Sequence, residues 1–150
     1  MMLSLLLSLL AASQAKALPP PPPPTMIDGL PIAGLPKQAL PAKGCAAYLF
    51  STGATKALVA VAGADPAQLR IAVDGKATDY ARSAEKTPAG FGFSGSTEYR
   101  GGDVTATLDM TITTRGDLTA GAIVSDATLR VDRPGRDSIV LPVAGLIGCV

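Results

Sequence analysis

Two cysteines, Cys45 and Cys149, are the residues whose type and spacing most directly suggest a chemical bond. In an exported protein, an isolated pair of cysteines predicts a disulfide. The bond would close a loop of about 100 residues, for which chain-entropy theory gives an upper value of about 4.7 kcal/mol of stabilisation. A thiol catalyst is the rival interpretation, but the chain has no histidine to activate a thiolate. Two cysteines are also too few for a structural zinc site.

The chain offers few groups for acid–base or metal chemistry. Histidine, the commonest general base at neutral pH and the commonest metal ligand, is absent, which excludes a Ser-His-Asp site. A paired-carboxylate hydrolase would need two acids facing a cleft. The acidic residues fall mostly in predicted turns or on a polar strand face: Asp65, Asp74, Asp117 and Asp109. We therefore expect no enzyme, no metal and no cofactor, and keep a carboxylate-based hydrolase as the less favoured alternative.

A glycine-rich stretch, 90–95, matches the Gly-x-Gly-x-x-Gly pattern of dinucleotide-binding loops. That pattern requires a strand before it and a helix after it, but strands follow here and no helical pattern is present. We interpret the stretch as a flexible loop that carries aromatic tips. If the protein binds a ligand, this loop is the first candidate, and its residues are Phe91, Phe93, Tyr99 and Arg100.

The strands that would position these groups can be aligned on one stretch, 103–113. Its apolar and polar residues alternate without exception, which predicts a strand with one buried face and one solvent-exposed face. The residues of the buried face are Val104, Ala106, Leu108, Met110 and Ile112. Small inward residues would leave space inside a barrel, whereas the two sheets of a sandwich could move closer together. The following strand is expected to add the inward residues Leu118, Ala120, Ala122 and Val124.

The strongest turn signal is Asp74-Gly75, which separates two alternating segments, 69–73 and 76–80. This dipeptide predicts a two-residue β-hairpin, because both turn positions need positive φ. The turn fixes the register and places Arg70 opposite Asp79, an opposite-charge pair worth about 0.2–1 kcal/mol.

The remaining segments from residue 44 onward predict short strands and tight turns. Strands are expected at 45–51, with Ala46, Tyr48 and Phe50 on one face, and at 56–62 and 138–150, with polar, turn-like residues at 83–90. A one-residue slip in alternation at Ser125-Asp126 suggests a bulge. Pro142 implies that the last strand is an edge, a bulge or a strand end. The pattern predicts a single all-β antiparallel meander of about seven to eight strands, either a small barrel or a β-sandwich.

The N-terminal segment, 1–17, has the features of a secretory signal peptide. It combines an apolar run with the small-x-small sequence Ala15-Lys16-Ala17. The run is shorter than the roughly 20 apolar residues that a spanning helix needs, so no transmembrane segment is expected in the mature form. We expect residues 1–17 to be removed and the protein to be exported to the periplasm or the extracellular space. The rest of the chain is expected to comprise a proline-rich linker, 18–43, and a β domain, 44–150.

The linker begins with six consecutive prolines, 19–24, which favour an extended polyproline II conformation. A Leu-Pro pair then recurs at Leu30, Leu35 and Leu40. One interpretation is a docking strip for an envelope or protein partner, with the leucines as anchors. The favoured interpretation is a spacer that holds the domain away from another surface.

These observations predict a non-catalytic exported domain that binds a small apolar ligand or a protein partner. The alternative is a structural or adhesive cell-envelope protein with a proline-rich spacer. The formal charge of +1 gives no sign of nucleic-acid binding. The partner itself is unknown at this stage.

Overall fold

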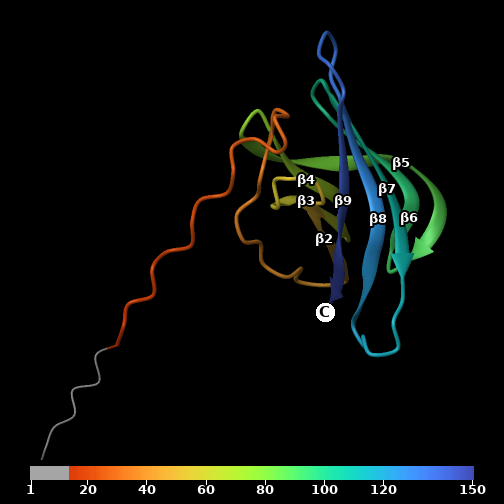
Figure 1. Ribbon diagram of the computed structural model, residues 1–150. Coiled ribbons are helices and arrows are strands. Elements are labelled where there is room, and N and C mark those ends of the chain that lie inside the picture. The colour runs from red at the N-terminus through yellow and green to blue at the C-terminus, as the bar shows by residue number, and fades with distance from the viewer. Residues whose placement is uncertain (1–13) are drawn as a thin grey trace, which may run out of the picture.

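The computed structural model describes residues 14–150, so residues 1–13 of the predicted signal peptide lie outside the described part of the chain. The described residues form nine β-strands and no helix (Figure 1). This confirms the all-β class predicted from the alternating pattern. In chain order the strands are β1 Ile32–Ala33, β2 Cys45–Ser51, β3 Leu58–Ala64, β4 Ala67–Val73, β5 Lys76–Gly90, β6 Phe93–Gly101, β7 Val104–Thr113, β8 Gly121–Asp132 and β9 Ile139–Cys149.

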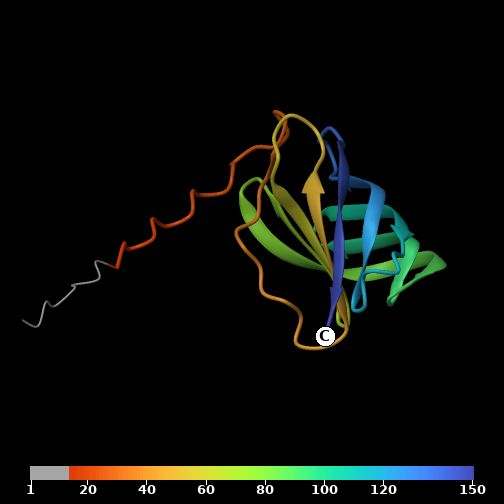
Figure 2. The same cartoon turned by 60° about the horizontal axis from the view of Figure 1, so that its bottom comes forward.

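Eight of the strands close into an antiparallel barrel. Their hydrogen-bonded order is β4-β3-β2-β9-β8-β7-β6-β5, and β5 pairs back onto β4. The long strand β5 makes this closure possible, because it passes from the β4 side of the barrel to the β6 side (Figure 1). Figure 2 shows the strands arranged around a common interior. Of the two predicted architectures, the structure is the barrel, with β1 as an extra strand on β4.

Aliphatic side chains pack the barrel interior, as expected for an eight-stranded barrel that is just wide enough for side chains to fill. Strand β7 follows the predicted alternation, with its threonines and Asp109 outside. The largest side chains that are fully buried are Ile27, Ile32, Leu49, Leu69, Ile71, Leu108, Leu129, Ile139 and Leu141.

Strand β8 differs from its prediction at its start. Leu118 and Ala120 were expected to face inward, but both lie in the β7–β8 loop and are exposed. The reason is that β7 ends at Thr113, which pairs with Ile123, so the earlier residues have no partner on β7. The predicted bulge is confirmed, because β8 contains one extra residue opposite β9 between Val124 and Ala127.

The β4–β5 hairpin has the predicted register, with Asp74 and Gly75 at positive φ and Arg70 opposite Asp79. The turn predicted over 83–90 is wrong, because β5 continues to Gly90. Here the strand has left β4 and pairs with β6 alone, so its side chains are mostly exposed. Polar residues tolerate this exposure, and the segment therefore lacks the apolar alternation that identifies a half-buried strand.

Pro142 lies within β9, which is a central strand between β2 and β8. It comes just past the last β2–β9 pair, Ser51 with Val143. Its carbonyl still accepts a hydrogen bond from the Thr52 amide at 3.2 Å. The proline is thus not at an end of its own strand and β9 is not an edge strand; it is tolerated because β2 no longer pairs with β9 at this position, so no ladder bond to β2 is lost.

Part of the proline-rich segment packs into the barrel. Ile27 and Ile32 are fully buried in the main core, and Leu35 is buried in a small second cluster outside it. Strand β3 pairs with β4 only as far as Arg70, and β1 continues the pairing at Ala72 and Val73. The segment over 27–35 therefore fills the gap that β3 leaves beside β4 and is not a free spacer there.

The first and last barrel strands meet at the two cysteines. Cys45 and Cys149 are directly paired in the β2–β9 ladder, and their sulfur atoms lie at disulfide distance, 2.07 Å apart. They are 104 residues apart in the sequence. The Val150 amide also donates to the Gly44 carbonyl at 3.0 Å, so both ends of the barrel segment are held together.

Candidate functional site

The residues predicted to form a binding loop do not form one. Phe93 and Tyr99 belong to β6 and are buried in the main core. Burial is the main cause of a raised pKa for the Tyr99 hydroxyl. Phe91 lies in the β5–β6 turn and is half-buried, whereas Arg100 is exposed and pairs with Glu98 at 2.7 Å. The alternation within 93–101 was hidden by small residues, so the sequence suggested a loop where the structure has a strand.

Phe93 does border a hollow of about 500 Å³ beside the β5–β6 hairpin. Its polar groups bind one another: the Glu85 carboxylate accepts hydrogen bonds from Ser94 at 2.8 Å and from Arg82 at 2.9 Å. Because these groups are already paired with each other, none of them is left to select a ligand.

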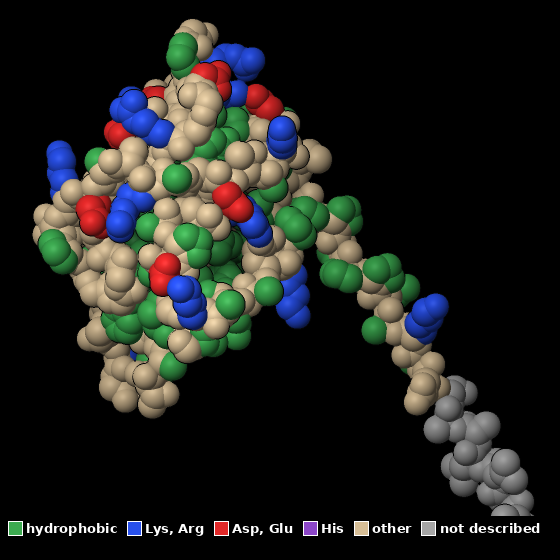
Figure 3. All heavy atoms as spheres, turned by 180° about the vertical axis from the view of Figure 1, so that it is seen from behind, with side chains coloured by type: hydrophobic (Ala, Val, Ile, Leu, Met, Phe, Trp, Pro, Cys, Tyr) green, Lys and Arg blue, Asp and Glu red, His purple; other side chains and the backbone are tan. Residues whose placement is uncertain are grey.

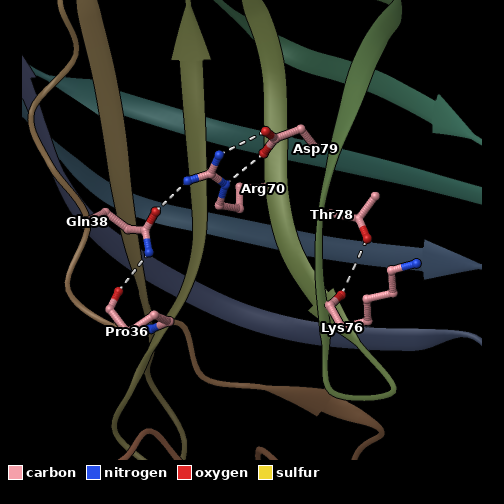
Figure 4. Close-up of polar contacts among 6 residues, drawn as sticks. All are labelled: Pro36, Gln38, Arg70, Lys76, Thr78 and Asp79. Atoms are coloured by element: carbon pink, nitrogen blue, oxygen red, sulfur yellow. Dashed lines mark hydrogen bonds and ion pairs between the residues drawn. The ribbon is translucent and has the colours of Figure 1, made fainter.

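A second candidate region lies where the chain crosses the outside of the barrel over residues 36–43, which we call the strap. Gln38 fastens the strap to the barrel (Figure 4). Its side-chain oxygen accepts a hydrogen bond from Arg70 at 2.8 Å, and its nitrogen donates to the Pro36 carbonyl at 2.9 Å. Further along, the Tyr48 hydroxyl donates to the Ala39 carbonyl at 2.9 Å.

Arg70 donates hydrogen bonds to two residues at once. Its Nε and Nη2 atoms donate to the two oxygens of Asp79 at 2.7 and 2.8 Å, which leaves Nη1 for Gln38. The planar guanidinium suits this use because its donors form a rigid fork. The hydrogen bonds that Arg70 donates to Asp79 lower the pKa of Asp79 and raise the pKa of Arg70. The paired charges thus hold the arginine in place to bind the strap.

The strap covers a hollow of about 300 Å³ against the outer faces of β2, β3 and β4. The Lys43–Asp65 ion pair, at 3.2 Å, borders this hollow. The polar residues on its walls include three that hold the strap, Gln38, Arg70 and Asp79. Its geometry is therefore that of a fastening between the strap and the barrel.

On the other side of the strap lies an apolar groove of about 440 Å³, which we call the outer groove. Phe50 and Leu146 are the most exposed of its large apolar side chains, at 47% and 56%. They come from outward positions of β2 and β9, and the strap lies along the border of the groove. The lining residues are Leu35, Lys37, Gln38, Tyr48, Phe50, Leu58 and Leu146.

The outer groove is unusual for the outside of this barrel. The outward face of β7 consists of threonines and Asp109, which are suited to water, whereas β2 presents Tyr48 and Phe50. The sequence did place these two aromatics on one face of their strand. It could not show that this face is outside, because Ala47 and Leu49 make the opposite face apolar as well. A strand that is apolar on both faces was the available signal for the groove.

Within residues 14–150, no three His, Cys, Asp or Glu residues lie close enough to share a metal ion. The same residues include no helix that is long and apolar enough to span a bilayer. No protein-family model, curated protein or solved structure matches the chain.

Proposed function

We propose that this protein is an exported, non-catalytic binding domain, and that the outer groove binds an apolar segment of a protein partner. The observation that carries this proposal is the exposure of Phe50 and Leu146 side by side with Tyr48 in one groove. Large apolar side chains that gather on the surface cost free energy in water, and such patches are typical of interaction sites. Burial of the two residues by a partner would remove this cost.

The packed interior favours the outside of the barrel as the binding surface. Leu49, Leu108 and Leu129 are fully buried among other aliphatic side chains. A small ligand inside an eight-stranded barrel needs space that such side chains otherwise occupy. The outer groove already has room and is open to a partner.

The arrangement of carboxylates favours a non-catalytic role. A carboxylate hydrolase needs two acids that face one cleft. Seven of the twelve acids are instead each paired with a basic side chain: Lys43–Asp65, Arg70–Asp79, Arg82–Glu85, Arg100–Glu98, Arg115–Asp117, Arg130–Asp132 and Arg133–Asp74. On the face drawn in Figure 3, acidic and basic side chains are interspersed with apolar ones, so no large area of one sign favours a highly charged partner.

Export is supported by the signal-like segment 1–17 and by the cysteine pair. Disulfides persist mainly in oxidising compartments such as the periplasm and the extracellular space. A structural or adhesive role is the second candidate, and the extended chain over 18–22, which stands clear of the barrel, favours it (Figure 1).

The test is a titration of the folded protein with Nile red, a neutral apolar dye whose fluorescence rises on burial. We expect saturable binding that Phe50→Ser and Leu146→Ser each weaken at least about tenfold, which corresponds to about 1.4 kcal/mol. The matched control is Leu118→Ser, which alters an exposed leucine in the β7–β8 loop, far along the chain from the groove residues. Equal binding by all four proteins would overturn the proposal.

A further inference from the structure

The N-terminal part of the described chain carries a polyproline segment, residues 18–24, which we call the arm and which is exposed over 18–22. Leu18 is 91% exposed, and the chain runs straight away from the barrel (Figures 1 and 3). The arm contains six prolines and no charged residue. A polyproline II segment is stiff and has no internal hydrogen bonds, so it loses little entropy when it binds.

The arm is rooted beside the outer groove. The Pro24 carbonyl accepts a hydrogen bond from the Gly34 amide at 2.8 Å, and Gly34 precedes the groove residue Leu35. The contact is close, because a Cβ atom on Gly34 would lie 2.9 Å from the Pro24 ring and 3.2 Å from Ala57. Gly34 therefore fixes the point at which the arm leaves the surface. A stiff segment that starts at this point and leads outward is not placed to turn back into the groove beside it.

The chemistry of the outer groove suits a proline-rich ligand. Aromatic-lined grooves commonly bind polyproline II segments, whose rings pack against the aromatic faces. Tyr48 and Phe50 supply the aromatic side chains, with Leu35, Leu58 and Leu146 around them. Lys37 is the one charged residue among the seven that line the groove, and no side chain of the arm is charged.

The surface next to the groove already binds an extended proline-containing segment. The Leu35 amide donates to the Leu58 carbonyl at 2.7 Å, and the strap continues from there across the outer faces of the neighbouring strands. Tyr48 contributes to both, since its hydroxyl binds the strap at Ala39 while its ring lines the groove. A second extended segment in the groove would therefore lie next to the strap and extend the contact that the strap already makes with the outside of the barrel.

We infer that the occupant of the outer groove is the arm of a second copy of this chain. Each copy has one arm and one groove side by side, so two copies can exchange arms around a twofold axis, which closes the assembly as a dimer. Removal of residues 1–17 takes away Lys16 and leaves 12 basic and 12 acidic side chains, so net charge opposes this association little. This inference rests on the proposed binding role of the groove and names its partner.

The test uses sedimentation equilibrium of the purified exported protein over a range of concentrations. One variant alters the groove, Phe50→Ser, and another alters the arm, Pro20→Ser with Pro22→Ser. Leu118→Ser is the control for an exposed apolar residue elsewhere. We expect a monomer–dimer equilibrium in the unaltered protein and in the control, with a dissociation constant at least about tenfold higher in each of the other variants. Thermal unfolding of each variant checks that it is folded.

An equimolar mixture of the two variants gives the decisive measurement. The arm variant keeps an intact groove, and the groove variant keeps an intact arm, so the mixture restores one of the two contacts. We expect mixed dimers that are weaker than those of the unaltered protein and stronger than those of either variant alone. Their absence would overturn the inference, as would a strictly monomeric unaltered protein.

Two further results would also overturn the inference while leaving the proposed function intact. If Phe50→Ser abolishes association but the arm variant still dimerises, two grooves contact each other and the arm is not the ligand. If Nile red binds the groove but the protein stays monomeric, the groove binds a different partner. In the arm variant the groove is vacant, so dye binding there should be as strong as in the unaltered protein or stronger.

Discussion

Arg70 and Asp79 face each other across the β4–β5 hairpin, with both guanidinium–carboxylate hydrogen bonds formed at 2.7 and 2.8 Å. The third guanidinium contact, from Nη1 to Gln38, joins the hairpin to the strap. One arginine thus connects the register of two barrel strands to the position of a segment outside the barrel.

The first prediction concerns acid stability. Arg70 lowers the pKa of Asp79, so the ionised carboxylate stabilises the fold above its unfolded pKa of about 3.9. This contribution is lost as the pH falls through the lower folded value. Because the pair is partly exposed, solvent screening keeps the effect small. Urea unfolding at several pH values should show a smaller acid-induced loss of stability in Asp79→Asn. An unchanged pH dependence would contradict this, and Asp126→Asn serves as the matched surface change.

The second prediction concerns the strap. Gln38→Ala removes the hydrogen bonds to Arg70 and Pro36, so the strap should leave the barrel surface more often. Trypsin cleavage after Lys37 should become several-fold faster. Cleavage after Lys86, on the exposed part of β5, should keep its rate and provides the internal control. Global stability should fall by about 0.5–1.5 kcal/mol, the usual net value of a hydrogen bond.

Sequence reasoning succeeded where the signal is local. The alternation of β7 and the Asp74-Gly75 turn each lie within a few residues, and both were predicted correctly. It failed where the outcome depends on distant partners. β5 continues to Gly90 because β6 pairs with it, and Ile32 is buried because β3 leaves a gap beside β4. Neither partner can be inferred from the segment itself.

Prediction of the candidate site from the sequence was limited in the same way, because it also depends on distant strands. The sequence suggested that the aromatic residues of 91–99 form a binding loop, but the side chains of Phe93 and Tyr99 are buried in the core. Tyr48 and Phe50 were correctly placed on one face of a strand, yet barrel closure decides that this face is outside. The groove therefore depends on the curvature of the sheet, which no local pattern encodes.

The third prediction concerns close backbone packing between β2 and β9. A Cβ atom on Gly145 would lie 1.8 Å from the Tyr48 carbonyl oxygen, which belongs to the backbone and cannot rotate away. Gly145→Ala should therefore lower the free energy of unfolding by at least about 3 kcal/mol, the upper part of the range for overpacking. Gly116→Ala is the matched control, because its added Cβ meets no atom within 4 Å. Denaturant unfolding measures both, and a Gly145→Ala protein as stable as the control would refute the expectation.

The fourth prediction concerns the cysteines. Replacement of Cys45 and Cys149 by serine should lower stability by about 2–4.7 kcal/mol, because the bond closes a loop of over 100 residues in the unfolded chain. Mass analysis of the native, unreduced protein should show two hydrogens fewer than the reduced chain. Maleimide labelling of both thiols without reduction would show that the bond is absent.

The fifth prediction concerns processing. The small-x-small pattern that ends at Ala17 should direct cleavage there. N-terminal sequencing of exported protein should therefore begin at or near Leu18, the first residue of the arm. Exported protein that still begins at Met1 would disprove removal of the segment.

Closure of the barrel by its first and last strands has a consequence for synthesis. β2 is made early, yet its seven-pair ladder with β9 can form only after the chain has been synthesised as far as Cys149. A product that stops before β9 would leave β2 and β8 as unpaired edges, and such edges recruit other chains into aggregates. Closure of this barrel therefore has to wait for the synthesis of β9. Premature termination anywhere before the last strand should yield aggregation-prone fragments in place of a smaller folded domain.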